Sequence, residues 1–341
     1  MLKRYLQTMV EGGDLEPDDA SEAMRILMAG KADPVQVAAL LIAWRMKGET
    51  AGEILGCARI LRQRSAKFGP GPDNTVDTCG TGGDGAGTFN ISTVAALVAA
   101  AAGVPNANHG GRAVASRCGS ADLLEALGMK LEIGTDAALR CLRETRFAFL
   151  YAPAFHGAMR HVAPVRRVLG TRTIFNLLGP LVNPAGVRRQ VMGVFHSRYL
   201  MPIAEALRGL GSEHVMVVHS RDGLDEFSVC GETDLVESGP GATALRRRRV
   251  RPEDFGLTRR QPGDLSGGGA ERNAAIALEI LEGRPGACRD AVVFNAGAAL
   301  VVGGAAGSIG EGIERACRAI DSGDGMKIVR RLRVLTSQGM K

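Results

Sequence analysis

The stretch "VDTCGTGGDGAGTFNIST" (residues 76–93) constrains the fold more than any other part of the chain. It holds five glycines between Gly80 and Gly87 and leads into an apolar run that begins at Ile91. Glycine backbone lets several N–H groups converge, and the N-terminus of a following helix adds free donors and its dipole. A strand, a glycine loop and a helix in this order predict a phosphate site in an α/β fold.

Two nucleotide-binding interpretations of this loop fail on detail. Residues 80–85 satisfy G-x-G-x-x-G, but in a dinucleotide fold the third glycine opens the helix and an acidic residue follows about 20 positions later. Here the polar "AGTFN" follows Gly85, and the later "VPNANHGG" contains no acid. No G-K-[ST] follows either, as a P-loop requires. A structural turn with an ordinary Asn, Ser or Thr cap remains the alternative.

Two further polar loops extend the prediction. Residues 108–122, "NHGGRAVASRCGSAD", again place glycines and arginines before a helix, and "RDGLDEFS" places Asp225 and Glu226 after the apolar "HVMVVHS". Magnesium is held by one or two carboxylates together with phosphate oxygens, and a serine hydroxyl such as that of Ser92 offers a further oxygen. The three loops therefore predict a ligand with two phosphate ends and a Mg²⁺ ion.

Composition narrows the class of protein. The chain has 341 residues with 45% hydrophobic and 23% charged residues, and its net charge of +6 suits an anionic ligand. Aromatic residues make up only 4%, which disfavours stacking on single-stranded nucleic acid. We expect the arginine run at 246–249 to be a solvated loop or edge, with a nucleic-acid or partner patch as the alternative. Seven scattered cysteines without C-x-x-C, no signal-peptide core and no apolar run long enough for a bilayer predict a cytoplasmic protein without a membrane span.

The pattern along the chain predicts an α/β fold with a small all-helical domain and a larger domain built on a mostly parallel sheet. Asp33-Pro34 and the Thr50–Glu53 capping box each start a helix in the first 70 residues. Strands are expected at "VDTCG", "KLEI", "FAFLYAP", "QVMGVFH" and "HVMVVHS", with helices near 91–102, 120–127, 136–144, 202–210 and 270–282. The predicted helical domain is 1–70, joined by the helical segment 156–184, and the α/β domain is 71–155 with 185–341.

Read together, these motifs resemble the anthranilate phosphoribosyltransferase family, of the nucleoside-phosphorylase-like class of phosphoribosyltransferases. The resemblance runs from about residue 5 to residue 323 and includes the later "PEDFGL", "ERNAAI" and "FNAGAAL". The matching motifs are G-T-G-G-D at 80–84, N-I-S-T at 90–93, G-S-A-D at 119–122, V-A-P-V-R-R at 162–167, R-T-I-F-N-L-L-G-P-L-V-N-P at 172–184 and D-E at 225–226.

The resemblance implies a helical domain hinged to the α/β domain, an active site in the cleft between them, and a homodimer formed through the helical domain. It implies Mg²⁺-dependent transfer of the phosphoribosyl group from phosphoribosyl pyrophosphate to the amine of anthranilate, the second step of tryptophan biosynthesis from chorismate. It places Mg²⁺ on Ser92, Asp225 and Glu226, and anthranilate on Gly80, Gly111 and Arg166. It places phosphoribosyl pyrophosphate on Gly80, Gly83, Asp84, Thr88, Asn90, Ile91, Ser92, Thr93, Asn108, His109, Gly110, Gly111, Arg112, Ala113, Val114, Ala115, Ser116 and Ser120.

One recognition loop departs from the family pattern. Where the family has K-H-G-N-R, this chain has Asn108 to Arg112, so a lysine near the diphosphate and an asparagine near the acceptor are replaced by Asn108 and Gly111. Losing one charged contact costs roughly 1.5–3 kcal/mol. Arg112 and Arg117 are the two candidate cations to compensate for the missing lysine. Gly157 stands where the family usually has proline. A paralogue with another aromatic or nucleobase-like acceptor, and a non-catalytic anion or nucleic-acid binder, therefore stay open as alternatives.

No residue is required by the sequence to act as a general base. The transferred ribose passes through an oxocarbenium-like state, so the reaction implied by the resemblance needs no strong nucleophile. His109 and His156 are the catalytic candidates, and a histidine that only orients the backbone is the alternative.

Overall fold

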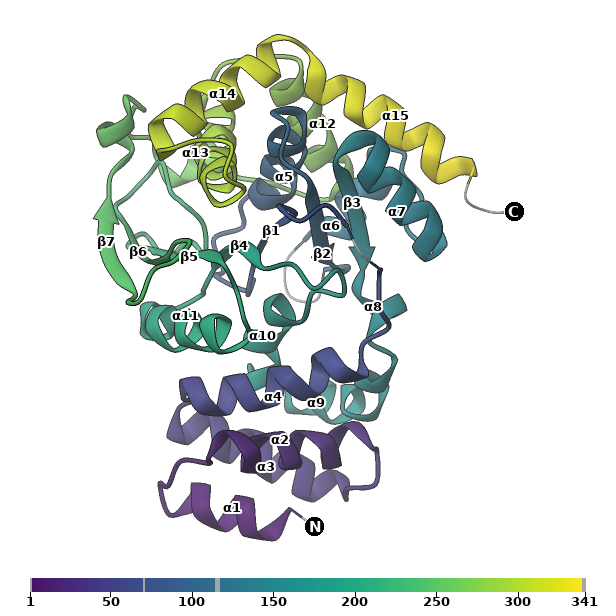
Figure 1. Cartoon of the computed structure of the whole chain (residues 1–341), viewed down its shortest axis with the longest axis vertical. Coiled ribbons are helices and arrows are strands. Elements are labelled where there is room, and N and C mark those ends of the chain that lie inside the picture. The colour runs from purple at the N-terminus through teal and green to yellow at the C-terminus, as the bar shows by residue number, and fades with distance from the viewer. Residues whose placement is uncertain (1, 70, 114–116, 339–341) are drawn as a thin grey trace.

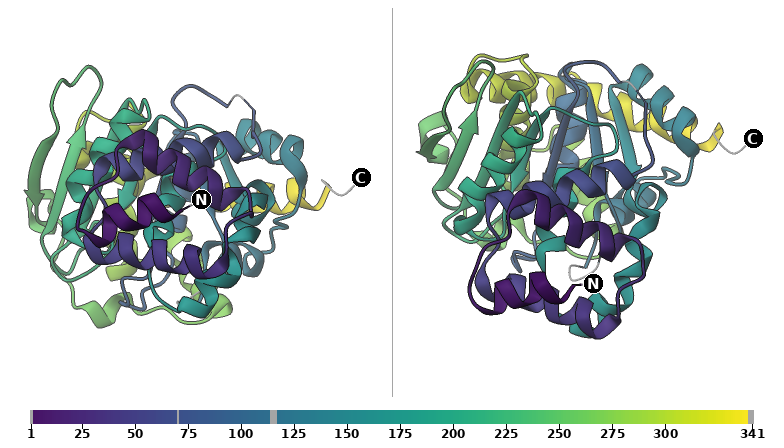
Figure 2. Two further views of the ribbon diagram at one scale, coloured as in Figure 1. Left: turned by 90° about the horizontal axis from the view of Figure 1, so that it is seen from below. Right: turned by 60° about the horizontal axis from the view of Figure 1, so that its bottom comes forward.

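A computed structural model describes residues 2–69, 71–113 and 117–338 of the chain. It has two parts, an α/β part built on one sheet and a layer of helices beneath it, and α10 lies at their junction (Figure 1). The N-terminal helices lie in front of the sheet in the view from below (Figure 2), and in Figure 1 they extend downward from it. This arrangement confirms the predicted fold class, with its small helical part and its large α/β part.

The sheet has seven strands in the order β3-β2-β1-β4-β5-β6-β7. The first five in sequence pair in parallel and the last two are antiparallel, so the sheet is mostly parallel, as predicted. Gly80 at the end of β1 stands opposite Gly193 at the end of β4. The strands are β1 Val76–Gly80, β2 Asn106–Gly110, β3 Phe147–Tyr151, β4 Arg189–Gly193, β5 His214–Ser220, β6 Thr233–Ser238 and β7 Arg246–Val250.

Alternation along the strands divides the apolar side chains between two cores. Successive strand residues point to opposite faces of a sheet. In β5, Met216 and Val218 join the core under the α/β helices, whereas Val215 and Val217 join a second core that continues into the N-terminal helices. The helical layer is therefore packed on the lower face of the sheet through one continuous apolar core.

The upper core is covered by helices that follow the strands. The helix α5 carries only small and branched apolar residues after its polar first turn and is buried between the sheet and α13. Among the described residues, no helix is long and apolar enough to cross a membrane. The covering helices are α5 Ile91–Ala101, α6 Ser120–Ala126, α7 Gly134–Thr145, α12 Ala270–Leu281, α13 Ala287–Val302, α14 Ile309–Asp321 and α15 Asp324–Gln338, with the 3₁₀ turns η4 Pro252–Phe255 and η5 Pro262–Leu265.

Two helices of the helical layer, α3 and α4, begin where the sequence predicts. Asp33 Oδ1 accepts the Val35 N–H at 2.8 Å to cap α3, and Thr50 and Glu53 form the predicted capping box of α4. The segment 156–184 is helical and packs on α2, α3 and α4, as expected. The remaining helices and 3₁₀ turns of the chain are α1 Lys3–Val10, α2 Pro17–Met28, α3 Pro34–Lys47, α4 Ala51–Arg64, α8 Ala152–Phe155, η1 Gly157–His161, α9 Ala163–Leu169, α10 Ile174–Leu178, η2 Gly179–Val182, η3 Ser197–Tyr199 and α11 Leu200–Gly209.

The sequence prediction was wrong about one strand and missed three. "KLEI" (130–133) is an irregular connection, because Lys130 N–H donates to Thr336 Oγ1 of α15 rather than to a neighbouring strand. The missed β2 is hidden by its asparagines, which bond to β1 inside the sheet, and β6 was also missed. The arginine run, expected as a solvated loop or edge, is the third missed strand, the exposed edge strand β7, and two of its arginines pair with acids of β6.

Candidate active site

The predicted loops converge at the carboxyl edge of the parallel strands. After β1 the chain turns to β2 and β3 on one side, whereas β4 and β5 continue on the other, so the sheet has a topological switch point between β1 and β4. Ligands of open α/β sheets bind in the crevice at such a point. The glycine loop follows β1, the loop at 111–119 follows β2 and the Asp225-Glu226 loop follows β5.

The glycine loop forms one wall of a cavity of about 410 Å³ lined mainly by polar groups. Gly82, Gly83, Gly85 and Gly87 all have positive φ, which L side chains rarely adopt, so the cluster is required by the backbone path. Asp225 Oδ2 accepts the Gly82 N–H at 2.8 Å and ties the loop to the carboxylate loop. A Cβ on Gly80 would lie only 2.4 Å from the same carboxylate oxygen.

Three carboxylates meet at this cavity. Burial raises the pKa of Asp225 to about 7, and repulsion from Asp84 adds to the effect. Burial and the adjacent Asp225 also raise the pKa of Glu226 well above its usual range. Glu226 Oε1 accepts the Ser92 N–H at 3.2 Å, which brings the predicted third ligand beside the pair. Negative charge held together at this depth is stabilised by a cation.

The donor set fits Mg²⁺ that is shared with a phosphorylated ligand. No described group of three or more His, Cys, Asp and Glu side chains has the geometry of a protein-only metal site. Magnesium does not require a site made by protein groups alone, because one or two carboxylates suffice when phosphate oxygens and water complete its octahedral coordination. Asp225, Glu226 and Ser92 supply oxygens of this kind at the cavity wall.

The replaced lysine position lies inside the sheet. Asn108 is buried in β2, and its Nδ2 donates to the carbonyl of Thr78 in β1 at 2.9 Å. Its side chain therefore binds the strand and brings no charge to the cavity. The side chain of Asn90 is likewise occupied. Its Nδ2 donates to the carbonyl oxygen of Cys118, and its Oδ1 accepts a hydrogen bond from Asn273 Nδ2.

The two arginines considered as substitutes for the lysine differ in their surroundings. Arg112 lines the cavity, but its guanidinium pairs with Asp122 at 3.1 Å and with Glu125. Arg117 is exposed and lines neither cavity of the site. The predicted contacts Val114, Ala115 and Ser116 lie outside the described residues.

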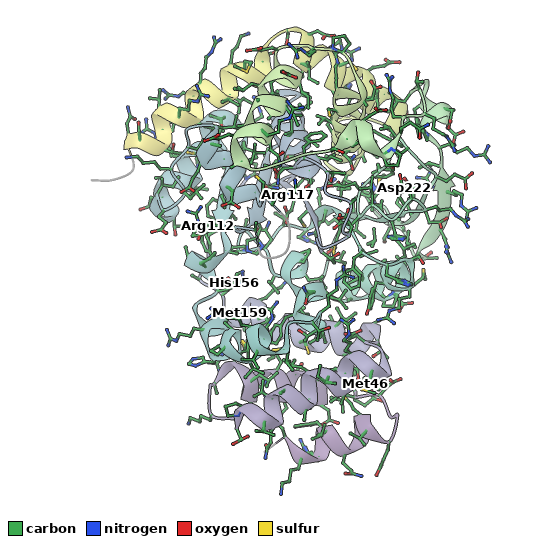
Figure 3. The ribbon with its side chains drawn as sticks, turned by 180° about the vertical axis from the view of Figure 1, so that it is seen from behind. Met46, Arg112, Arg117, His156, Met159 and Asp222 are labelled. Carbon is green, nitrogen blue, oxygen red and sulfur yellow. The ribbon has the colours of Figure 1, made fainter. Side chains whose placement is uncertain are left out.

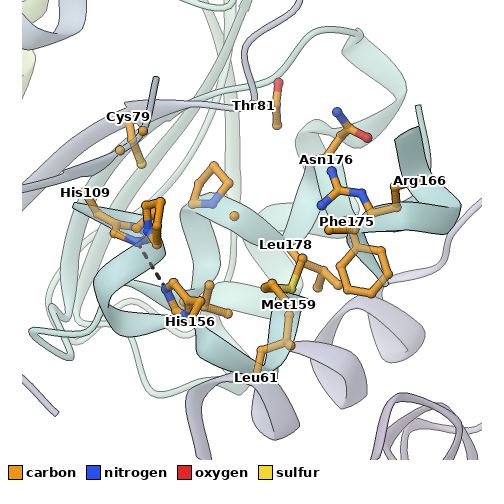
Figure 4. Close-up of a pocket in the computed structure, with 18 of the residues that line it drawn as sticks. Leu61, Cys79, Thr81, His109, His156, Met159, Arg166, Phe175, Asn176 and Leu178 are labelled. Atoms are coloured by element: carbon orange, nitrogen blue, oxygen red, sulfur yellow. Dashed lines mark hydrogen bonds between the residues drawn. The ribbon is translucent and has the colours of Figure 1, made fainter. Parts of the chain in front are cut away.

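A second cavity, of about 710 Å³, adjoins the first and reaches the helical layer. Figure 4 shows its wall, with Leu61, Met159, Phe175 and Leu178 on one side and the histidines on another. Arg166 lines this wall together with Arg112 and Arg160, and its guanidinium lies over the Phe175 ring, 5.1 Å from the ring centroid. Burial lowers the pKa of Arg166, which forms no ion pair among the described residues. An unpaired guanidinium on an apolar wall suits an aromatic carboxylate.

The two candidate catalytic histidines are in direct contact. The Nε2 atoms of His109 and His156 lie 3.1 Å apart, so one ring must donate and the other accept. Burial lowers the pKa of His109 to about 3, with repulsion from His156 adding to it, and burial lowers that of His156 to about 4. Both rings are therefore neutral at pH 7 and are weak bases.

The structure gathers nearly all described site residues around these cavities. Thr93 is the exception, because it is buried in the first turn of α5 and lines neither cavity. No local signal in the sequence pointed to Leu61 or Met159, since ordinary core residues look the same, and Leu178 lies in the motif at 172–184 but was not assigned to the site. The predicted residues on the polar cavity are Gly80, Gly83, Asp84, Thr88, Asn90, Ile91, Ser92, Asn108, His109, Gly110, Gly111, Arg112, Ala113, Ser120, Arg166, Asp225 and Glu226.

Comparison with known proteins defines the class. Residues 72–326 match the α/β domain of a glycosyl transferase family, and residues 3–65 match the helical bundle domain of that family. The chain is similar to anthranilate phosphoribosyltransferase of Rubrobacter xylanophilus, at 49% identity over 97% of this chain and 96% of the relative. It is similar to that of Symbiobacterium thermophilum at 48% identity, over 98% of both chains.

The solved structures that this chain resembles carry the same enzyme name as these relatives. Anthranilate phosphoribosyltransferase of Thermus thermophilus superposes with a TM-score of 0.91 at 45% identity, covering 97% of this chain and 99% of that one. The enzyme of Saccharomyces cerevisiae in complex with PRPP and Mg gives a TM-score of 0.89 at 27% identity, over 98% of both chains. The chain therefore belongs to the anthranilate phosphoribosyltransferase family of glycosyl transferases.

Proposed function

We propose that this protein transfers the phosphoribosyl group of phosphoribosyl pyrophosphate to the amine of anthranilate, giving N-(5-phosphoribosyl)anthranilate and pyrophosphate in tryptophan biosynthesis. One observation carries the proposal: a polar cavity with a glycine loop and carboxylates opens into an apolar cavity with an unpaired arginine. Gly80, His109, Gly111 and Arg166 border both cavities. A ligand in each thus meets the other at this shared border.

The polar cavity is assigned to the donor. The glycine loop from Gly80 to Asp84, together with Thr88, Asn90 to Ser92 and Ser120, surrounds the phosphates. Ser92, Asp225 and Glu226 hold Mg²⁺, which neutralises the departing pyrophosphate when it is bound. Backbone N–H groups of the loop share that task, because preorganised donors stabilise developing negative charge without reorganisation.

The apolar cavity is assigned to anthranilate. Arg166 pairs with its carboxylate, and the surrounding apolar side chains exclude water from the ring and the amine. Water exclusion protects the donor from hydrolysis, and holding both substrates in line supplies proximity. Gly111 leaves open space on this border, since, apart from its chain neighbours, no heavy atom of the described residues lies within 4 Å of a Cβ built there.

The chemical step requires little of the protein's side chains. The bond from ribose C1 to the pyrophosphate oxygen breaks, the bond from the amine nitrogen to C1 forms, and the nitrogen releases one proton. That proton becomes acidic once the new bond forms, so a weak base is sufficient. His109 and His156, both neutral, are assigned to hold the acceptor end of the site in place.

The domain division follows the two cavities. We assign residues 1–70 and 156–184 to one domain and 71–155 with 185–341 to the other, with the acceptor cavity between them. In this division the chain crosses between them at 65–75, at 155–156 and at 184–185. Closure about these crossings would bring Arg166 toward the donor and exclude water.

A homodimer through the helical domain is the second part of the proposal. Val35 and Met46 on α3 and Val168 on the contacting α9 are 76%, 82% and 88% exposed, the three highest values among the large apolar side chains of the described residues. Figure 3 shows Met46 on the helical part, away from His156 and Met159 at the junction. Met46→Glu with Val168→Glu should give a monomer by light scattering, whereas Val334→Glu, on α15 at the far end, should remain a dimer. A dimeric double variant would contradict this interface.

The assigned reaction is tested by the fluorescence of anthranilate. Mixing the protein with anthranilate, phosphoribosyl pyrophosphate and Mg²⁺ should consume the signal, and omission of any component or addition of EDTA should stop the loss. A protein that binds phosphoribosyl pyrophosphate with Mg²⁺ but leaves anthranilate unchanged would contradict the acceptor assignment. It would favour another aromatic acceptor that fits the space at Gly111.

A further inference from the structure

Arg172 lies just before α10 and contacts the glycine loop from outside the site. Its guanidinium donates a hydrogen bond to the carbonyl oxygen of Gly83 and lies 4.3 Å from the centroid of the Phe195 ring. It forms no ion pair with any described residue, and it lines neither cavity of the site. Its contact with the loop is therefore made from behind the ligand-facing surface.

The Gly83 carbonyl determines the direction of a ligand-facing donor. In a planar trans peptide, the C=O of one residue and the N–H of the next point in opposite directions. A carbonyl of Gly83 turned toward Arg172 thus turns the Asp84 N–H the other way, and both residues line the polar cavity. Within the described chain, the N–H groups of Gly83 and Asp84 find no protein acceptor.

Arg172 is itself held from two directions. Arg45 Nη1 on α3 donates to the Arg172 carbonyl at 2.6 Å, which connects it to the helical layer. Phe195, beneath the guanidinium, donates its N–H to Thr81 Oγ1 of the same loop at 2.9 Å. The N–H of Gly82 is fixed separately by Asp225. The loop is consequently pinned at Thr81, Gly82 and Gly83 before any ligand arrives.

We propose that Arg172 is a positioning residue that orients the Gly83–Asp84 peptide so that its N–H binds the pyrophosphate of the donor. The inference rests on the proposed function for the identity of that ligand. Because the same arginine is bound by α3 and precedes the acceptor-side residues Phe175 and Asn176, it also connects the acceptor side of the site to the donor loop.

Arg172→Met tests this, because it retains an apolar stem over Phe195 and removes the donor. Arg198→Met is the matched control: Arg198 also lies over an aromatic ring, 4.6 Å from the centroid of Tyr199, but makes no contact with the loop. The KM for phosphoribosyl pyrophosphate and the Kd for Mg²⁺-pyrophosphate by calorimetry should both rise about tenfold in Arg172→Met. The KM for anthranilate and the melting temperature should stay at their wild-type values, and Arg172→Lys should recover part of the affinity.

Two outcomes would overturn the proposal. One is a wild-type Kd for Mg²⁺-pyrophosphate in Arg172→Met. The other is a fall in melting temperature with an equal rise of both KM values, which would mark Arg172 as merely structural. Calorimetry needs no acceptor, so a wild-type protein that binds Mg²⁺-pyrophosphate but leaves anthranilate unchanged would contradict the proposed function and leave the Arg172 comparison decisive on its own.

Discussion

The two adjoining cavities are built by different parts of the chain and by different physical means. The polar cavity of about 410 Å³ is formed by loops that leave neighbouring parallel strands, with backbone donors and buried carboxylates. The apolar cavity of about 710 Å³ is formed where helical segments pack beside the sheet, and the guanidinium of Arg166 lies over Phe175 on its wall. The first is suited to charge and the second to an aromatic ring. A change should therefore affect mainly the substrate whose cavity the altered group serves.

The largest effect should come from the carboxylates of the polar cavity. Glu226→Gln keeps the size of the side chain and removes the charge that holds Mg²⁺, so kcat/KM should fall about a thousandfold. Steady-state assays over a range of Mg²⁺ concentrations measure this. Glu205→Gln on the exposed face of α11 is the control and should retain wild-type activity. Full activity of Glu226→Gln at ordinary Mg²⁺ would separate the metal from this cavity.

On the acceptor side, Arg166→Gln should raise the KM for anthranilate about thirtyfold, because a charge-assisted pair with a carboxylate is lost. The KM for phosphoribosyl pyrophosphate should change little. Arg167→Gln, one position along α9 and exposed, provides the matched control. Equal losses for both substrates would show that the two cavities do not act separately.

The histidine pair makes the acceptor side sensitive to acid. The folded pKa values of about 3 and 4 lie below the unfolded value of about 6.5, so the unfolded chain gains protons first as the pH falls. Their contribution to stability is therefore present above pH 6.5 and is lost toward pH 4. Between pH 7 and 5, His156→Gln should lose about 2 kcal/mol less unfolding free energy than the wild type.

Denaturant unfolding at the two pH values measures that difference. The exposed His161→Gln serves as the control and should follow the wild type. An unchanged pH dependence in His156→Gln would mean that the pair is not held neutral in the folded protein.

The smallest effect concerns the connection between the two sides. Arg45→Met removes the hydrogen bond to the Arg172 carbonyl but leaves the guanidinium of Arg172 in place, so the KM for phosphoribosyl pyrophosphate should rise only about threefold. Arg59→Met on the exposed face of α4 is the control. An effect larger than that of Arg172→Met would place the main connection on α3 instead.

The sequence predicted the polar cavity far better than the apolar one. The glycines at positive φ are close together in the sequence, and Asp225 and Glu226 are adjacent to each other. Each group therefore forms a local pattern that the sequence alone reveals. Leu61 and Met159 meet Phe175 only through the packing of α4, η1 and α10, and nothing local distinguishes these first two from other core residues. Asn108 shows the opposite case, because polar side chains concealed strand β2, next to the edge of the sheet.

The most direct test of the account is a crystal structure with Mn²⁺ in place of Mg²⁺, phosphoribosyl pyrophosphate and a non-reactive anthranilate analogue. The account predicts the anomalous signal of the metal beside Ser92, Asp225 and Glu226, the pyrophosphate on the glycine loop, and the analogue's carboxylate on Arg166. A metal bound elsewhere, or an analogue bound away from Arg166 with the donor in place, would contradict the division of the site into a donor cavity and an acceptor cavity.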